Sequence, residues 1–198
     1  MNHFNEQQAL RVDIYGLLAR LFRIAPDQEL LTWLSELDVT HDEHHGMSAA
    51  WSLLKLSAQT TSEMSCADEY QDLFIGIGRG ELVPYGSWYL TGSLMEMPLA
   101  KLRNDLAQLG FERDESVKEP EDNIAALLEV MAMLVESGSE HTQKIFFNRH
   151  IQTWFERFCH DLKQAKSSAF YASVGELALQ FLTVEQTRFI ENPQKSIA

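Results

Sequence analysis

Apolar residues recur at helical spacing along nearly the whole chain, and this periodicity limits the possible folds more than any other feature. The first stripe runs from Leu10 to Leu21 and stops before Pro26. Similar stripes follow over residues 27–37, 51–56, 61–74, 95–109, 120–135, 147–162 and 170–181. No segment shows sustained period-two alternation, and Leu occurs 26 times against 17 for Val and Ile together. Because Leu favours helices and β-branched residues favour strands, we expect an all-α fold.

A charged link over residues 111–118 divides this helical pattern. It separates a larger lobe, residues 1–110, from a smaller one, residues 119–198. We expect one multi-helix domain over residues 1–198 with a hinge at the link. Hinges invite domain swapping, so the sequence leaves a monomer and a domain-swapped homodimer both open.

The charge and the composition exclude several classes of protein. A net charge of −13 and a pI near 4.9 disfavour nucleic-acid binding. They suit a cationic partner, although acidity also simply keeps a protein soluble. The chain has no run of eighteen apolar residues, and its first residues lack the basic start and apolar core of a signal peptide. Two cysteines make no disulfide framework, so we expect a cytoplasmic protein with buried thiols.

The stretch from Gly76 to Leu90 is the longest passage that does not fit a helix. Its four glycines would each cost about 1 kcal/mol inside a helix, and its proline lacks a backbone donor. Rigid aromatic side chains beside a backbone kink are typical of peptide-binding surfaces. We therefore predict that this stretch walls a peptide groove, with Tyr85 and Ser87 exposed. The alternative, that its rings plug the core, is at least as well supported for Trp88 and Leu90.

A second candidate feature is the acidic start of the helix predicted from Pro120. Proline fits the first helical position, and Glu121 and Asp122 suit the positive end of the helix dipole in the first turn. Residues 112–122 carry six acidic residues against two basic ones, which is more than capping requires. Such a cluster can accept a pair of arginines through bidentate contacts.

An enzymatic interpretation competes with peptide binding. All-helical phosphohydrolases hold Mg²⁺ with carboxylates at helical spacing. This chain offers such a set in Glu69, Asp72, Glu119, Asp122 and Glu129. Because no obvious base or phosphate-binding lysine accompanies them, a Mg²⁺-dependent nucleotide phosphohydrolase is the alternative rather than the main hypothesis.

A histidine pair offers a weaker metal hypothesis. His41 and His45 are four residues apart, which would place both on one helical face. A solvated loop explains them better, because no third ligand is near and Gly46 interrupts a helix. We therefore expect no catalytic residues, no resident metal ion and no cofactor.

Four short motifs follow one another in a distinctive order, within a similarity that extends from about Leu10 to Phe181. They are Glu69-Tyr70-x-x-Leu73-Phe74, Pro84-Tyr85-Gly86-Ser87-x-Tyr89-Leu90, Glu119-Pro120-x-Asp122 and Phe147-x-x-His150-x-x-x-Trp154-x-x-x-Phe158. Together they resemble the TorD/DmsD family of molybdoenzyme maturation chaperones. The resemblance implies an all-helical cytoplasmic chaperone that binds the twin-arginine signal peptide of its client and assists folding and cofactor insertion before export. The client would be a reductase or a formate dehydrogenase, and the glycine-rich run looks most like the relatives associated with formate dehydrogenase.

The resemblance and the acidic cluster together predict a peptide-binding site. Its residues are Pro84, Tyr85, Gly86, Ser87, Tyr89, Glu119, Glu121, Asp122 and Asn123. The two arginines of the signal peptide would dock on Glu119, Glu121 and Asp122, and its apolar stretch would pack against Pro84, Tyr85 and Tyr89. The family usually has a histidine where this chain has Asn123. An amide still forms hydrogen bonds but does not titrate, which puts in doubt any role that needs proton uptake there.

Overall fold

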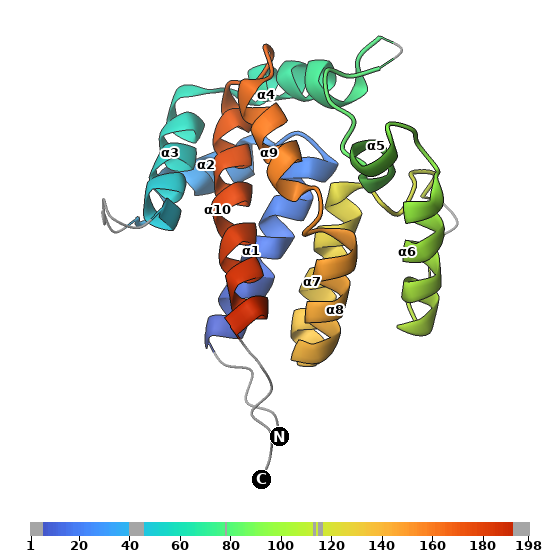
Figure 1. Ribbon diagram of the computed structural model, residues 1–198. Helices are drawn as coiled ribbons and strands as arrows, with labels where there is room; N and C mark the ends of the chain where they lie inside the picture. The colour runs from blue at the N-terminus through green and yellow to red at the C-terminus, as the bar shows by residue number, and fades with distance from the viewer. Residues whose placement is uncertain (1–5, 40–45, 78, 113, 115–116, 192–198) are drawn as a thin grey trace.

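Helices dominate this computed structural model, which describes residues 6–39, 46–77, 79–112, 114 and 117–191 (Figure 1). In chain order they are α1 (Glu6–Arg23), α2 (Gln28–Glu36), α3 (Gly46–Thr60), α4 (Glu63–Tyr70) with a π-helical extension (Gln71–Ile75), α5 (Gly86–Thr91), α6 (Met97–Gln108), α7 (Ile124–Ser137), α8 (Glu140–His150), α9 (Phe155–Gln164) and α10 (Phe170–Glu191). Within the described residues there is no strand, only an isolated antiparallel bridge between Tyr85 and Asn123. The prediction of an all-α fold is confirmed.

Several helix ends follow from local sequence signals. Asp27 caps α2, because its Oδ1 accepts a hydrogen bond from the Leu30 N–H at 2.8 Å. Gly138 ends α7 with a φ of 79°, a left-handed conformation that glycine adopts without strain. One helix start was placed too late, because α3 already begins at Gly46 rather than near Trp51.

The start of α7 also differs from the prediction, which placed it at Pro120. The helix begins at Ile124, and Asn123 is its N-cap, with Oδ1 accepting from the Ala125 N–H at 2.8 Å. Before it, the Asn123 N–H donates to the Pro120 carbonyl at 3.2 Å and closes a turn. The assignment of Glu121 and Asp122 to a first helical turn was therefore wrong, because an amide side chain three residues after the proline caps the helix instead.

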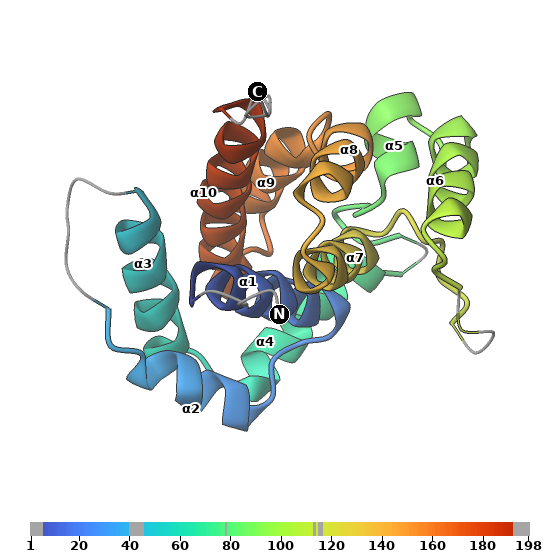
Figure 2. The same cartoon turned by 90° about the horizontal axis from the view of Figure 1, so that it is seen from below.

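Helices from distant parts of the chain pack side by side around one core. α1 packs along α7, while α10 packs against both α3 and α9. Figure 2 shows α2 and α3 at one edge and α5 and α6 at the opposite edge. Since α1 and α3 precede the 111–118 link and α7 and α10 follow it, both sides of the link share the core. A hinge at the link remains a prediction.

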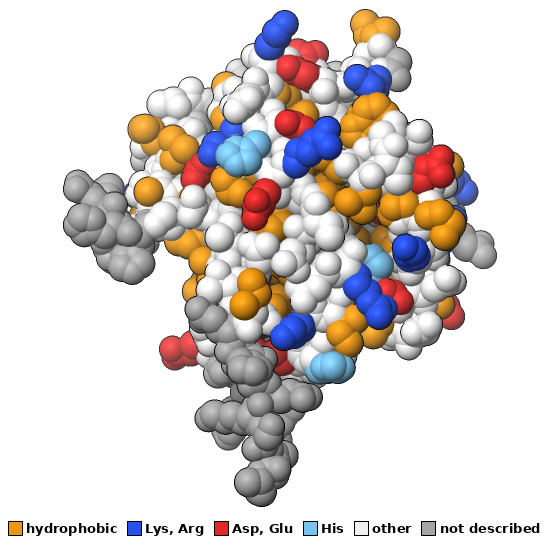
Figure 3. Space-filling view, in the orientation of Figure 1, with side chains coloured by type: hydrophobic (Ala, Val, Ile, Leu, Met, Phe, Trp, Pro, Cys, Tyr) orange, Lys and Arg blue, Asp and Glu red, His pale blue; other side chains and the backbone are white. Residues whose placement is uncertain are grey.

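On the one side of the molecule that is shown (Figure 3), charged and apolar side chains do not separate into distinct regions. Acidic and basic side chains lie interspersed with hydrophobic ones in Figure 3. None of the helices in the described part of the chain is both long and apolar enough to cross a bilayer.

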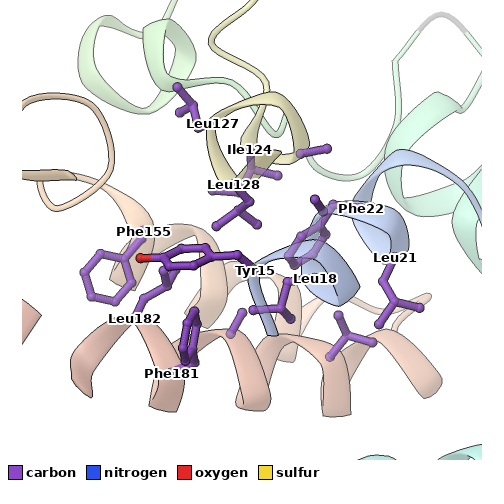
Figure 4. Close-up of a cluster of buried hydrophobic side chains, with 14 of the residues drawn as sticks. Tyr15, Leu18, Leu21, Phe22, Ile124, Leu127, Leu128, Phe155, Phe181 and Leu182 are labelled. Atoms are coloured by element: carbon purple, nitrogen blue, oxygen red, sulfur yellow. The ribbon is translucent and has the colours of Figure 1, made fainter. Parts of the chain in front are cut away.

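The centre of the core is Tyr15 of α1, which is fully buried. Figure 4 shows its ring among side chains from α1, α7, α9 and α10. Its ring contacts Phe181 edge-on at 4.7 Å between centroids, and its hydroxyl donates to Glu185 Oε2 at 2.9 Å. The tyrosine therefore joins apolar packing to a polar partner, as a buried hydroxyl requires.

That polar partner belongs to a buried ion pair between the first and last helices. Arg11 Nε and Nη2 lie 2.7 and 2.5 Å from the two carboxylate oxygens of Glu185. A third bond runs from Arg11 Nη2 to Gln143 Oε1 at 2.9 Å, so the network also includes α8. Because breaking a buried pair leaves an uncompensated charge, this network fixes how α1, α8 and α10 meet.

The two cysteines are buried and neither takes part in a disulfide, so the buried-thiol prediction is confirmed. Burial raises the pKa of both the Cys66 and the Cys159 thiol. Both side chains therefore act as small apolar groups rather than as nucleophiles.

Candidate peptide-binding site

Backbone hydrogen bonds bring together the two segments that the sequence assigned to one site. The Gly86 N–H donates to the Asp122 carbonyl at 2.9 Å, and the Ile124 N–H donates to the Pro84 carbonyl at 2.9 Å. Tyr85 and Asn123 form the bridge between these bonds. The loop before α5 and the turn before α7 are thus one continuous structure.

Asp122 lies inside this structure and clamps the start of α5. It is 3% exposed, and its Oδ2 accepts bonds from the Ser87 N–H at 2.7 Å and from the Ser87 hydroxyl at 2.5 Å. The side chain of Tyr85, the N-cap residue of α5, forms no capping hydrogen bond with this helix, so Asp122 caps it from elsewhere in the chain. Its other oxygen, Oδ1, is buried and has no hydrogen-bond partner among the residues that the structure describes.

Several predicted contact residues are buried. Ser87 is 0% exposed, so the prediction of an exposed Ser87 was wrong: its hydroxyl bonds to Asp122 inside the protein. Pro84 and Gly86 are buried, and Asn123 is 4% exposed as the cap of α7. These residues shape the site from within.

Tyr89 is also buried, because its ring stacks on Trp154 with 5.3 Å between centroids. Burial raises the pKa of the Tyr89 hydroxyl. Neither Pro84 nor Tyr89 can therefore form the outer apolar wall that the sequence suggested for a peptide. Leu90, by contrast, is 44% exposed, so the core-plugging alternative does not describe it.

Tyr85 and Glu119 lie at the outer edge of the site. The Tyr85 hydroxyl donates to Glu119 Oε1 at 3.3 Å, and burial raises the pKa of this half-buried tyrosine. The same carboxylate binds Arg23 Nη1 at 3.0 Å, while Arg23 Nη2 binds Glu129 at 2.7 Å. Glu121 binds Arg103 at 2.8 Å. Both glutamates of the predicted site therefore already hold guanidinium groups of the chain itself.

A groove of about 300 Å³ lies beside these glutamates, between α6, the segment before residue 120, and α7. We call it the acidic groove. Its described lining combines apolar walls with five carboxylates and only two guanidinium groups. The walls include Leu106, Phe111, Val117, Val130 and Met133, the carboxylates belong to Glu112, Asp114, Glu119, Glu121 and Glu129, and the guanidinium groups to Arg23 and Arg103.

A second hollow of about 580 Å³ lies on the other side of the same turn, between α5, α6 and α8. We call it the Asp122 cavity, because Asp122 lines it. Helix α6 separates the two hollows: Leu102 lines the cavity and Arg103 lines the groove. The turn before α7 thus presents Glu119 and Glu121 to one hollow and Asp122 to the other.

A charged cluster in the Asp122 cavity was not predicted. His150 Nε2 lies 2.8 Å from Asp105 Oδ2, and Arg149 Nη1 lies 3.1 Å from the same oxygen. Burial, and to a smaller extent Arg149, lower the pKa of His150, and together they outweigh its partner Asp105, which raises it. Since a carboxylate only accepts, the neutral ring donates through Nε2. Burial raises the pKa of Asp105, but the bonds from His150 and Arg149 outweigh it and hold that pKa below its usual value.

Four of the five carboxylates in the phosphohydrolase alternative bind other groups of the protein, and Asp122, one of the four, binds Ser87. Glu69 accepts three backbone N–H bonds at the start of α10, and Glu119 and Glu129 share Arg23. In the described part of the chain, no group of three or more His, Cys, Asp or Glu residues is placed to hold a metal ion. His41 and His45 lie outside the described residues.

Comparison with known proteins identifies the family of this chain. A family model described as nitrate reductase delta subunit matches residues 40–160. The chaperone protein TorD of Vibrio cholerae is 26% identical over 197 residues, with 87% of this chain and 88% of the relative covered. The relative named as the Tat proofreading chaperone DmsD in Haemophilus influenzae is 28% identical over 187 residues, with coverage of 87% and 88%.

A solved structure shares the fold. It is a protein assigned to redox enzyme maturation from Archaeoglobus fulgidus, with a TM-score of 0.51 and 20% identity. The match covers 79% of this chain and 93% of that one. The chain is therefore a member of the nitrate reductase delta subunit family, together with the TorD and DmsD chaperones it matches.

Proposed function

We propose that this protein is a chaperone, not an enzyme, that binds the twin-arginine signal peptide of a molybdoenzyme before export. Family membership and the chaperone relatives support the general role. The observation that carries the peptide site is the acidic groove, whose described lining combines apolar side chains with five carboxylates and two guanidinium groups. A basic pair followed by an apolar run complements such a surface.

The groove is suited to arginine in particular. Arg23 and Arg103 bind Glu119 and Glu121 at 3.0 and 2.8 Å, and these contacts within the chain support recognition of a guanidinium group by the two carboxylates. The surplus of carboxylates over guanidinium groups favours an added cation. Lysine lacks the planar fork that binds a carboxylate through two parallel bonds, so the site discriminates between the two basic residues.

The two arginines bind on opposite sides of the turn before α7. Successive side chains of an extended peptide point to opposite faces, and consecutive residues of the turn line the two hollows. One guanidinium group enters the acidic groove and shares Glu119 and Glu121 with Arg23 and Arg103, which already bind them. The other enters the Asp122 cavity, where Asp122 Oδ1 has no partner. Access requires a small displacement of α6, which fully buries only Leu99 and Leu102.

Titration calorimetry with synthetic peptides tests this function. The peptides are a twin-arginine leader, its twin-lysine counterpart and a scrambled sequence of the same composition. We expect a micromolar dissociation constant for the leader, or about 8 kcal/mol, and at least roughly tenfold weaker binding of the other two. Equal affinity for the scrambled peptide would make the protein a general helical adaptor, and no binding would reject the function.

The placement of the two arginines is tested with single-arginine peptides. Replacing one arginine should make binding insensitive to Asp122→Asn, and replacing the other should make it insensitive to Glu121→Gln. Asp122→Asn keeps an oxygen for the Ser87 N–H, so the site stays folded. Equal responses of both peptides to both variants would contradict a separate hollow for each arginine.

The client is a molybdoenzyme of the reductase or formate dehydrogenase type, and the encounter takes place in the cytoplasm. Affinity capture from cytoplasm should recover a large cofactor-containing enzyme whose precursor carries a twin-arginine leader. Removal of that leader should abolish capture. Capture of the leaderless enzyme at the same yield would show that the signal peptide is not what the chaperone recognises.

A further inference from the structure

The apolar run of a bound leader needs a surface, and the buried Pro84 and Tyr89 do not provide one. Next to the Asp122 cavity, the end of α5 and the turn into α6 expose four large apolar side chains. Leu90, Leu94, Met95 and Met97 are 44%, 45%, 71% and 64% exposed. We call them the apolar ridge. In Figure 3, hydrophobic side chains gather over α5 and the start of α6, beside charged side chains.

The backbone of the ridge holds an unusual conformation. Met95 has a φ of 59°, and it is the one non-glycine residue with positive φ in the described chain. A side chain in this region costs roughly 1–2 kcal/mol relative to the right-handed conformation. Strain of this kind persists where the surroundings impose it, often at ligand-binding segments. Here it accompanies a methionine side chain that is mostly exposed.

We infer that the apolar ridge is the docking surface for the apolar run that follows the arginine pair of a leader peptide. This inference rests on the proposed function and assigns a place to the part of the ligand that the acidic residues do not bind. Leu90 and Pro98 line the Asp122 cavity, so the ridge continues directly from the proposed arginine site. Methionine side chains are flexible and polarizable, which suits apolar runs of varied sequence.

The charge of the protein favours a peptide over a lipid surface as the occupant. The net charge is −13, and residues 90–97 include Glu96 but no basic residue. Anionic lipid headgroups attract clusters of basic residues, which this segment lacks. A basic leader, by contrast, is attracted to the whole molecule before its apolar run contacts the ridge.

A triple variant tests the ridge in the full chain. Leu94→Gln/Met95→Gly/Met97→Gln removes apolar surface without adding charge, and glycine relieves the positive φ. The control is Met64→Gln on α4, where the side chain is 75% exposed. Two peptides share the arginine pair, but in one the apolar run is replaced by serine and glycine.

We expect the triple variant to bind the complete leader at least roughly tenfold more weakly, which is about 1.4 kcal/mol. It should bind the serine-glycine peptide as the wild type does, and Met64→Gln should bind both peptides normally. Met95→Gly alone should unfold at the same or a higher temperature while losing affinity. If Met95 had only a structural role, Met95→Gly would lower both the unfolding temperature and the affinity for the leader.

Unchanged affinity of the triple variant for the complete leader would overturn the inference, as would equal weakening for both peptides. Co-sedimentation with phosphatidylcholine–phosphatidylglycerol vesicles tests the lipid alternative: vesicle binding that the triple variant loses, with unchanged peptide affinity, would assign the ridge to membranes. Failure of the ridge is separate from failure of the proposed function. In the first case the wild type still binds the leader in preference to the scrambled peptide, and in the second it does not.

Discussion

Asp122 is the residue on which most of the site depends. One carboxylate oxygen receives two bonds from Ser87 and holds the start of α5, while the other has no partner at the edge of a cavity. A single side chain therefore fixes the structure of the site and provides an acceptor within it. The two roles can be separated, because Ser87 takes part only in the first.

Truncations at this contact test the structural role. Asp122→Ala removes an acceptor from two buried donors, so we expect unfolding free energy to fall by about 2–4 kcal/mol. Ser87→Ala removes the hydroxyl donor but keeps the backbone bond to Asp122, so we expect the unfolding free energy to fall by about 1 kcal/mol. Urea unfolding measures both. A loss below about 0.5 kcal/mol for Asp122→Ala, the size of an ordinary surface change, would show that α5 needs no such clamp.

His150 makes stability depend on pH. Its pKa is lowered in the folded protein, so the unfolded chain binds the proton more readily. The stabilising contribution is complete above the unfolded pKa of about 6.5 and is lost as pH falls through the folded value. The lowered pKa of Asp105 acts in the same direction at more acidic pH, below about 3.9.

We therefore expect the unfolding free energy to decrease from pH 7.5 to pH 5, with a smaller decrease in His150→Gln. Arg149, which faces the same carboxylate, stays charged throughout this range, and Asp105 stays ionised. Urea unfolding at intervals of half a pH unit measures the slope. An identical slope in the wild type and in His150→Gln would contradict the assignment to His150.

At the scale of helices, the sequence predicted what local signals control. The apolar stripes placed most helices, and the structure has Asp27 and Gly138, residue types typical of helix ends, as caps of α2 and α7. The start of α7 was misplaced because Pro120 and Asn123 are both acceptable start signals, and the proline was preferred. The residue that caps α5 could not be predicted from the sequence, because Asp122 lies 35 residues after Ser87 and no local pattern connects them.

The start of α10 shows the same kind of remote capping. Glu69 of α4 accepts bonds from the N–H groups of Ala169, Phe170 and Tyr171 at 2.7, 3.0 and 2.6 Å. A carboxylate at this end also meets the positive end of the helix dipole. Glu69 therefore joins α4 to α10.

Replacing that carboxylate should be costly although no apolar contact is lost. We expect Glu69→Gln to lower the unfolding free energy by about 1–3 kcal/mol, because charged acceptors form the stronger bonds. Asp68→Asn, an exposed neighbour on the same helix, is the control and should change it by less than about 0.5 kcal/mol. Equal stability of the two variants would mean that α10 does not depend on this cap.

Across the whole molecule, the buried pair of Arg11 and Glu185 connects the first and last helices. We expect Arg11→Met to lower the unfolding free energy by about 3–5 kcal/mol, because it leaves Glu185 charged and buried. Arg11→Met/Glu185→Met should recover much of that loss, since neither charge remains. A double variant as unstable as the sum of the single variants would indicate that the two residues act independently.

The sequence predicted which two segments of the candidate site lie together, but not which of their side chains are exposed. The sequence paired residues 84–89 with 119–123, and hydrogen bonds connect these segments. It did not reveal that Ser87 and Tyr89 face inward, because burial of a short loop depends on partners such as Asp122 and Trp154. Nor did the sequence reveal that Glu119 forms an ion pair with Arg23, because the two residues are 96 positions apart in the chain.

The central claim is that carboxylates in the acidic groove recognise the arginines of a leader peptide. The most direct test is calorimetric titration of twin-arginine and twin-lysine leaders into the wild type and into Glu119→Gln/Glu121→Gln. Glu36→Gln/Glu63→Gln, which removes two exposed charges elsewhere, is the control. We predict that the wild type and the control prefer arginine by about tenfold and that the groove variant loses this preference. An undiminished preference for arginine in the groove variant would contradict the claim.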